Sequence, residues 1–309
     1  MNWSSPLPAV LLVGLVVASG AYLVAVADRL VGARSSDRGQ RLADALAGPA
    51  REGALLLLTR RSTTQRPDAQ AWALAPVTLT AMAALVVAAV PFSEGVAVAD
   101  VADGIVLIGA AFALVMVGVF LHGWSANAPT PLLGGYRFVA LALSYEMPLA
   151  LVLIAAALPA ESLSVGAIVA SQADLWNVVR QPLGLPLFLV VGIGLAGWGP
   201  LNMADGADLA GGTTAEVSGA ARLAWEVARR SVVVAVAVVA AAVFLGGWQG
   251  PLLPGWVWMA TKSVAVVVVM VAVGHQVARV RLEQFVVVAW TVLIPLALVD
   301  VFVSGAFAL

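Results

Sequence analysis

Eight long apolar segments follow one another along the chain, and they restrict its fold more than any other feature. They cover roughly residues 6–27, 70–91, 103–122, 136–158, 182–199, 230–247, 256–276 and 284–305. A helix needs about 20 apolar residues to cross a hydrocarbon core about 30 Å thick. Lipid offers no partner to backbone polar groups, and the segments lack the alternation of a membrane β-strand, so each is expected to be a helix. The sequence therefore predicts an all-α, polytopic membrane protein with about eight transmembrane helices, in which residues 1–309 form a single integral membrane domain.

Composition agrees with this class and excludes several kinds of site. Hydrophobic residues make up 62% of the chain and charged residues 11%, whereas about 25% of the residues of soluble domains are charged. The net charge of −1 gives no reason to expect a nucleic-acid partner. The absence of cysteine excludes thiolate-bound zinc, iron–sulfur clusters and disulfides. A bis-histidine haem would have only His122 and His275 as ligands, so we expect no metal and no cofactor bound by this chain alone.

The basic residues predict how the spans are oriented. If the spans alternate in direction, 14 of the 16 basic residues fall on one side, and only Arg180 and Lys262 fall on the other. The 14 are Arg29, Arg34, Arg38, Arg41, Arg51, Arg60, Arg61, Arg66, Arg137, Arg222, Arg229, Arg230, Arg279 and Arg281. Cytoplasmic loops carry the excess of Lys and Arg, so we expect a multi-pass protein of the plasma (inner) membrane with both termini outside. The first charge is Asp28, so residues 6–27 are expected to be a retained span rather than a cleavable signal peptide.

Two connections are expected to contain further helix. In the long cytoplasmic connection 28–69, Leu42–Leu58 alternates leucines with Arg and acidic residues, which predicts an amphipathic helix on the membrane surface or on a partner subunit. The outer loop 159–181 has room for a short helix. Gly192 to Gly197 match the spacing of a dinucleotide fingerprint, but they lie within an apolar span, where small residues serve close helix packing.

Glu146 is the first candidate for a functional side chain. It lies inside the span 136–158, followed by Pro148, and a carboxylate at membrane depth costs about 2.5–3.5 kcal/mol even on insertion scales. A proton relay would justify that cost, and so would a structural hydrogen bond to a neighbouring helix.

Other polar residues have two interpretations each. Asp103 lies at the start of the third span, where it is either a charge at the helix end or part of a relay. Lys262 lies six residues into the seventh span, where it could snorkel outward or pair with a buried carboxylate. Asp300 is expected to reach the outer interface. The glycine-rich loop 200–221 collects further polar groups, including Asp205 and Glu216, which solvation alone could explain.

Several sequence blocks, in order, resemble the H subunit of bacterial NADH-quinone oxidoreductase, which belongs to the subunit-1 family of respiratory complex I and of related membrane-bound hydrogenases. The blocks are Leu74–Pro76 with Val90–Phe92, Gly123–Asn127, Leu132–Arg137, Ser144–Glu146, Phe244–Trp248, Trp258–Lys262 and Pro295–Leu298. Asp68 resembles the acidic residue just before the family's second helix. The resemblance covers about residues 20–300.

The resemblance implies a subunit that joins a membrane arm to a peripheral arm, borders a quinone cavity and begins a chain of buried carboxylates. Glu146 and Glu216 fall on carboxylates of that chain, and Asp103 on the acidic residue at the start of the third helix. Arg137 and Lys262 match basic residues of the family pattern. Asp205 is acidic at a position where the family pattern also has an acidic residue. These six residues form the expected proton path.

The two segments that wall the quinone chamber in this family differ here. In the loop after the fifth span, a Glu and an Arg of the family pattern are replaced by Leu195 and Trp198, and an Asp by Asn202. In the first cytoplasmic loop only Asp37–Gly39, with Arg38, remains of the family motif. Arg38, Trp198 and Asn202 are therefore the candidate quinone-proximal residues of a divergent paralogue.

The resulting hypothesis is a membrane-arm subunit without a redox centre, in a complex that couples quinone-linked or hydrogenase-linked electron transfer to H⁺ or Na⁺ translocation. Its partners would be other membrane-arm and peripheral-arm subunits and lipid, with quinone possible in the complex. The alternative is a structural anchor of such a complex without quinone chemistry. A stand-alone secondary transporter is disfavoured because the sequence shows no internal repeat.

Overall fold

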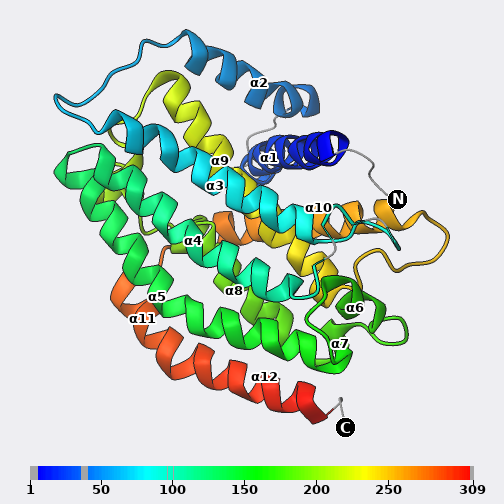
Figure 1. Ribbon diagram of the computed structural model, residues 1–309. Coiled ribbons are helices and arrows are strands. Elements are labelled where there is room, and N and C mark those ends of the chain that lie inside the picture. Colours follow the sequence, from blue (N-terminus) through cyan, green and yellow to red (C-terminus); the bar gives the residue numbers. More distant parts are fainter. Residues whose placement is uncertain (1–5, 36–40, 96, 100, 307–309) are drawn as a thin grey trace.

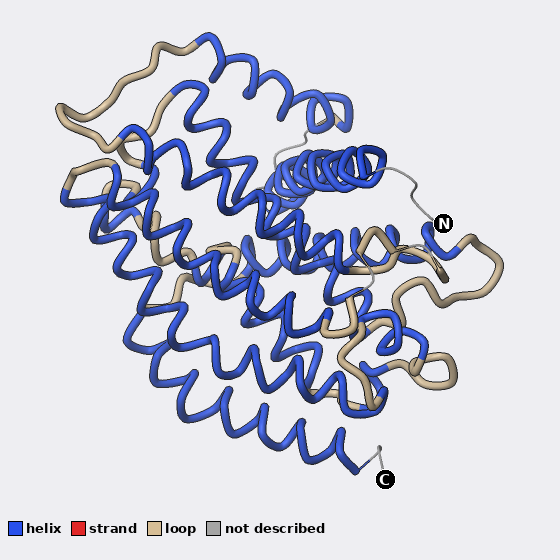
Figure 2. The backbone as a smooth tube through the Cα atoms, viewed as in Figure 1, coloured by secondary structure: helices blue, strands red, loops and turns tan. Residues whose placement is uncertain are grey.

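The computed structural model describes residues 6–35, 41–95, 97–99 and 101–306 of the chain. These residues form helices joined by loops, with no strand among them (Figure 2). Seven helices, or runs of consecutive helices, are long and apolar enough to cross a membrane. They are α1 (Pro6–Ser35), α3 (Ala69–Ala89), α4 (Gly104–Ser125), α5 (Pro129–Ala157), α9 (Gly219–Phe244), α10 (Gly255–Gln276) and the run from α11 (Leu282–Val288) to α12 (Ile294–Ala306). The all-α membrane class is confirmed.

About eight spans were expected, and one of the eight segments forms a helix shorter than expected. Residues 182–199 form only α8 (Gly184–Leu195), and its 12 residues reach about 18 Å at 1.5 Å per residue, short of the about 30 Å of hydrocarbon. The helix ends because Gly197 and Gly199 adopt left-handed φ angles of +57° and +51°, and Pro200 follows.

Close packing explains the glycines of α8. A Cβ on Gly192 would meet Val236 at 2.4 Å, and one on Gly194 would meet the ring of Tyr145 at 3.1 Å. The interpretation of these glycines as helix-packing residues is therefore confirmed.

The connections gather at two opposite ends of the bundle (Figure 1). One end holds α2 (Leu42–Leu58), the α4–α5 turn and the first turns of α9 and α11, and we call it the arginine-rich end. The other holds α6 (Val165–Ala170), α7 (Asn177–Arg180) and the α9–α10 loop. The first turn of α1 and the last turn of α12 lie toward this second end. Which end faces the cytoplasm stays a prediction.

The core of the bundle is α9. In its most apolar stretch of 18 residues, 83% of the residues are buried, against 22–56% in the corresponding stretches of the other spans. It packs against α3, α1, α10 and α8. The outer spans expose large apolar side chains, as at Leu11 and Phe302. Because these side chains would be unfavourable in water, the exposed faces of the bundle suit lipid.

The predicted surface helix is present with the expected bounds, as α2. It lies across α1 and α9 with Ala45 and Gly48 buried, while Leu46 and Leu55 are exposed. The Tyr22 hydroxyl donates to the Leu46 carbonyl at 2.5 Å, and Arg29 pairs with Glu52. These contacts fix α2 at the arginine-rich end.

The last span contains a π-helical segment, Ala289–Leu293. Pro295 lies two residues after its end; this residue has no N–H to donate, and its ring clashes with the carbonyl four residues back in a regular helix. A wider turn relieves that clash. The connection 159–181 contains α6 and α7, so the expected short helix is also present.

Candidate functional site

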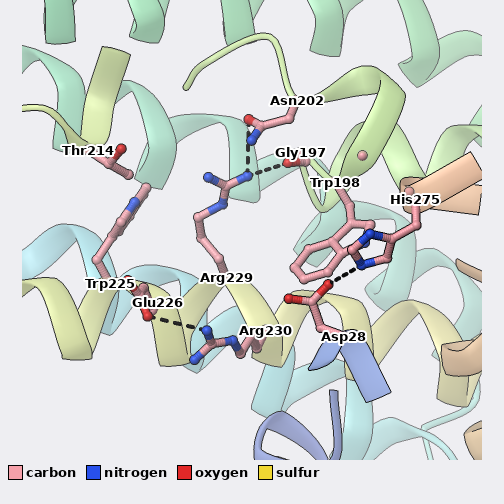
Figure 3. Close-up of a pocket in the computed structure, with 12 residues that line it drawn as sticks. Asp28, Gly197, Trp198, Asn202, Thr214, Trp225, Glu226, Arg229, Arg230 and His275 are labelled. Atoms are coloured by element: carbon pink, nitrogen blue, oxygen red, sulfur yellow. Dashed lines mark hydrogen bonds and ion pairs between the residues drawn. The ribbon is translucent and has the colours of Figure 1, made fainter. Parts of the chain in front are cut away.

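A cavity of about 260 Å³ lies at the arginine-rich end, where α1, α9 and α10 meet the loop after α8 (Figure 3). Its walls combine acidic, basic and aromatic side chains with bare glycine backbone. The lining residues are Asp28, Gly197, Trp198, Gly199, Asn202, Thr214, Trp225, Glu226, Arg229, Arg230, Gly274 and His275.

Arg229 organises one wall of this cavity. Its guanidinium pairs with Asp205 and donates to the Gly197 carbonyl. The exposed fractions of the Arg229 and Asp205 side chains are 15% and 7%. Asp205 also accepts a hydrogen bond from the Thr213 hydroxyl. Because the loop 196–214 lacks long helices, this buried ion pair is the main polar link between the loop and α9.

The opposite wall holds a histidine–carboxylate pair. His275 Nε2 of α10 lies 2.8 Å from Asp28 Oδ1 of α1, and Figure 3 shows both beside the Trp198 indole. Glu226 and Arg230 of α9 form a further pair at 3.3 Å. The imidazole, the two carboxylates and the guanidinium offer both donors and acceptors, so this wall can form hydrogen bonds with a polar ligand.

Glycines let the loop approach α10 closely. A Cβ on Gly199 would lie 2.4 Å from the Gly274 backbone, and one on Gly274 would lie 2.8 Å from the Trp198 indole nitrogen. The Asn202 Oδ1 atom lies 3.4 Å from Arg229, and rotating the amide would let it donate to Gly197 and Asp205 at 3.3 Å. Arg279 donates to the backbone carbonyl of Asn202.

A second, apolar cavity of about 730 Å³ forms a groove along the same three helices. On α9 it is lined by Val234, Ala237 and Val238, and on α10 by residues from Trp256 to Val268. Arg230, in the polar cavity, is four residues from Val234, about 6 Å along the helix axis. The polar cavity and the groove therefore lie within about one helical turn of each other along α9.

Arg137 and Lys262 of the expected proton path lie far apart. Arg137 pairs with Asp208 in η3 (Ala207–Leu209) at the arginine-rich end. The hydrogen bond from Arg137, with its positive charge, holds the pKa of Asp208 below its ordinary value. Lys262 lies near the opposite end, where its ammonium donates to the carbonyls of Gly247 and Gln249 at 3.0 and 2.7 Å and lies 4.2 Å from the Trp176 ring centroid.

Of the four acids of the expected path, Asp205 pairs with Arg229, and the other three are not joined. Glu146 is half-buried in α5, Glu216 is half-buried in the turn before α9, and Asp103 is exposed before α4. Within the described ranges none of their side chains forms a hydrogen bond or ion pair, and none lines the two cavities. Of the residues expected near quinone, Trp198 and Asn202 line the polar cavity, whereas Arg38 lies outside the described residues.

The expectation that Asp300 reaches the outer interface is wrong. Its side chain is 1% exposed, because α12 turns it toward α8, where a Cβ on Gly184 would lie 3.1 Å from Asp300 Oδ2.

Sequence reasoning missed Asp28, Arg229 and His275 as residues of one site. Their signal was present: each is a charged or titratable residue at or next to the end of a predicted span. The number of basic residues at the span ends predicts how the spans are oriented in the membrane. Nothing in the sequence says which span ends lie next to one another in space.

Comparisons with known proteins give a consistent result. The family described as NADH dehydrogenase matches residues 7–305. The H subunit of the NADH-quinone oxidoreductase of Anoxybacillus flavithermus is 34% identical over 81% of this chain and 77% of its own length. The corresponding H subunit numbered 2 of Rhizobium meliloti is 32% identical over 83% and 82%, and that of Dehalococcoides mccartyi is 30% identical over 96% and 84%. The chain therefore belongs to the NADH dehydrogenase family, together with the H subunits of bacterial NADH-quinone oxidoreductases.

Proposed function

We propose that the chain is a membrane subunit of an NADH-quinone oxidoreductase-like complex, in which the polar cavity and the apolar groove together hold a quinone. Its family supports the complex, and the relatives' names supply the ligand class. The observation that carries the proposal is the succession of a polar and an apolar cavity along α1, α9 and α10. Quinones have the same two-part chemistry, a polar ring and a long apolar tail.

The groove has the length that an apolar tail requires. On α1 it is lined from Leu12 to Arg34, which at 1.5 Å per residue corresponds to about 33 Å. A tail in this groove would be away from polar groups. Burial of its apolar area would stabilise binding by about 25 cal/mol per Å². The ring would then lie toward the polar cavity.

The polar cavity would orient the ring and exchange protons with it. His275, paired with Asp28, can donate a hydrogen bond to a ring oxygen and deliver a proton when that oxygen is reduced. The chain has no cysteine to hold an iron–sulfur cluster, so in this proposal electrons come from a partner protein. Other subunits would dock at the arginine-rich end, next to this cavity.

The same proposal assigns proton or Na⁺ movement to Glu146, Glu216 and Asp103, with Asp205, Arg137 and Lys262. Its support is the cost of keeping a carboxylate such as Glu146 in a membrane helix. In a field of 100 mV one transferred charge corresponds to about 2.3 kcal/mol. Whether the electron donor is of the dehydrogenase or the hydrogenase kind follows from the other subunits.

A structural anchor without quinone chemistry is the second candidate. It is favoured because no hydrogen bond or ion pair joins Asp103, Glu146 and Glu216 within the described ranges. The buried Arg229–Asp205 pair, which suits a stabilising role, also favours it. Glu146→Gln in the assembled complex separates the two. Normal assembly with unchanged ion translocation would remove the relay interpretation.

The quinone proposal is tested by narrowing the groove. Val264 lines it and is 43% exposed, so Val264→Trp should fit without disturbing the core. Val299→Trp on α12, at a residue 48% exposed that lines neither cavity, is the matched control.

In the purified complex, Val264→Trp should raise the KM for quinone at least several-fold. Electron transfer to a water-soluble acceptor should stay unchanged. An equal effect of both variants, or none, would refute the quinone site, while failure of the tagged chain to copurify with redox subunits would refute the complex.

A further inference from the structure

The buried carboxyl of Asp300 has no role in the proposed quinone site and lies away from it, at the end of the bundle that holds α6 and α7. Asp300 precedes the end of α12, Ala306, by six residues, about 9 Å along the helix axis. Its side chain is 1% exposed, and neither oxygen forms a regular hydrogen bond in the part of the chain that the structure describes. The backbone N–H of Gly184 acts on the carboxyl, but it donates to the Gln181 carbonyl at 3.0 Å.

A second polar side chain without a partner borders the same spot. Gln181, in the turn between α7 and α8, is 0% exposed, and neither of its amide atoms Oε1 and Nε2 has a partner among the described residues. A Cβ on Gly184 would lie 3.1 Å from Asp300 Oδ2 and 3.4 Å from the Gln181 amide carbon. Because glycine has no Cβ, the carboxyl and the amide both face the bare backbone of Gly184.

No described cation neutralises Asp300. The elements packed against α12 are α5, η1 (Leu158–Ala160), η5 and α8, and their charged residues are Arg137 and Glu146, both on α5. Arg137 pairs with Asp208 at the arginine-rich end, and Glu146 forms no ion pair within the described ranges. Arg180, next to Gln181, donates instead to the Ser171 carbonyl at 2.7 Å.

An ionised carboxylate in this position would be costly. Burying a charge without a partner is among the least favourable events in a protein interior, and such a group neutralises instead. A protonated carboxyl has one donor and retains acceptor capacity, and Gln181 offers both an acceptor and a donor. Its NH₂ can also donate to the carboxylate, so Gln181 serves both protonation states.

We propose that Asp300 and Gln181 form a proton-binding site at the α6–α7 end of the bundle. The carboxylate oxygen takes a proton from hydronium at that end, releasing water, and the resulting carboxyl donates its hydrogen bond to Gln181 Oε1. Release of the proton reverses this step, with the carboxylate then accepting from Gln181 Nε2. The site exchanges protons on one side of the membrane, independently of whether quinone binds on the other.

Infrared difference spectroscopy of the full chain in its purified complex tests this site without relying on activity. The protonated carboxyl of an aspartate gives a C=O stretching band separate from the carboxylate bands. Spectra at acidic minus alkaline pH should contain one such band that shifts when aspartate is labelled with carbon-13 at its side-chain carboxyl, and shifts again in D₂O. Asp300→Asn should abolish this band.

Asp174→Asn is the matched control, because Asp174 is exposed between α6 and α7, has no part in the proposed site and should leave the band unchanged. If Asp300→Asn fails to fold, Gln181→Leu is the second variant, and it should shift the band by removing its hydrogen-bond partner. A wild-type spectrum without a protonated aspartate band would overturn the proposal. A band that persists in Asp300→Asn, or that does not shift in D₂O, would also overturn it. A band that changes with NaCl but not with choline chloride would overturn it as well, because it would indicate a Na⁺ site.

Discussion

Arg229→Met should destabilise the protein far more than the loss of an ordinary surface charge. Its partner Asp205 is 7% exposed, so the substitution leaves a buried carboxylate without its cation. Removing one member of a buried pair costs about 3–5 kcal/mol. Arg222, 3.0 Å from Glu226 and 47% exposed, is the matched control, because exposed pairs contribute about 0.2–1 kcal/mol.

Thermal unfolding in mild detergent measures the difference. A loss of 1 kcal/mol lowers the Tm of domains of comparable size by about 2–4 °C, so a loss of about 3 kcal/mol corresponds to roughly 6–12 °C. Arg222→Met should lower the Tm by no more than about 4 °C. The double variant Arg229→Met with Asp205→Asn should recover part of the loss, because it removes the unpaired charge.

The reasoning would be refuted if Arg229→Met and Arg222→Met lowered the Tm equally. It would also be refuted if Asp205→Asn destabilised the Arg229→Met variant as much as it destabilises the original protein. Either result would mean that Asp205 is solvated or finds another partner, and that the loop 196–214 is held to α9 by other contacts.

Three further predictions follow from the packing and charges. Gly192→Leu should lower the stability by about 1–3 kcal/mol through overpacking against Val236, whereas Gly14→Leu, with open space around its Cβ position, should not; melting in detergent distinguishes them. Lys262→Met should leave the Gly247 and Gln249 carbonyls unpaired, at about 1–3 kcal/mol, and limited proteolysis should then cut the α9–α10 loop faster; an unchanged rate would contradict it. The pKa of Asp208 is lowered in the folded protein, so its pair with Arg137 is fully present above the ordinary aspartate pKa of about 3.9 and is lost as the pH falls through the lowered value; hydrogen exchange of residues 206–211 should accelerate only at such acidic pH, and acceleration near neutral pH would count against the pair.

Sequence reasoning predicted the membrane class and the placement of most helices, because a 20-residue apolar run has few other solutions. It extended the fifth span too far. Hydropathy averages over residues, whereas Gly197 and Gly199 end the helix through their left-handed backbone, which hydropathy does not detect. It began the sixth span too late, at residue 230 instead of Gly219, because the first turns of α9 are polar.

The candidate site was predicted only in part. Trp198 and Asn202 were expected near quinone from a family resemblance; both line the polar cavity, and their contact with quinone stays a prediction. The ion pairs that shape the cavity join residues distant in the sequence, such as Asp28 and His275, and no local pattern reports such pairing. Asp300 was misplaced because distance from the end of a span does not tell which way a helix turns its side chains.

Photo-crosslinking in the intact complex tests the quinone site most directly. The probe is a quinone whose isoprenoid tail bears a diazirine, and the labelled peptides are mapped by mass spectrometry with an excess of unmodified quinone as competitor. The account predicts competed labelling on α1, α9 and α10 at groove residues such as Leu23, Val238 and Val264. Labelling confined to lipid-facing residues of α12 and α4, unaffected by competitor, would contradict it.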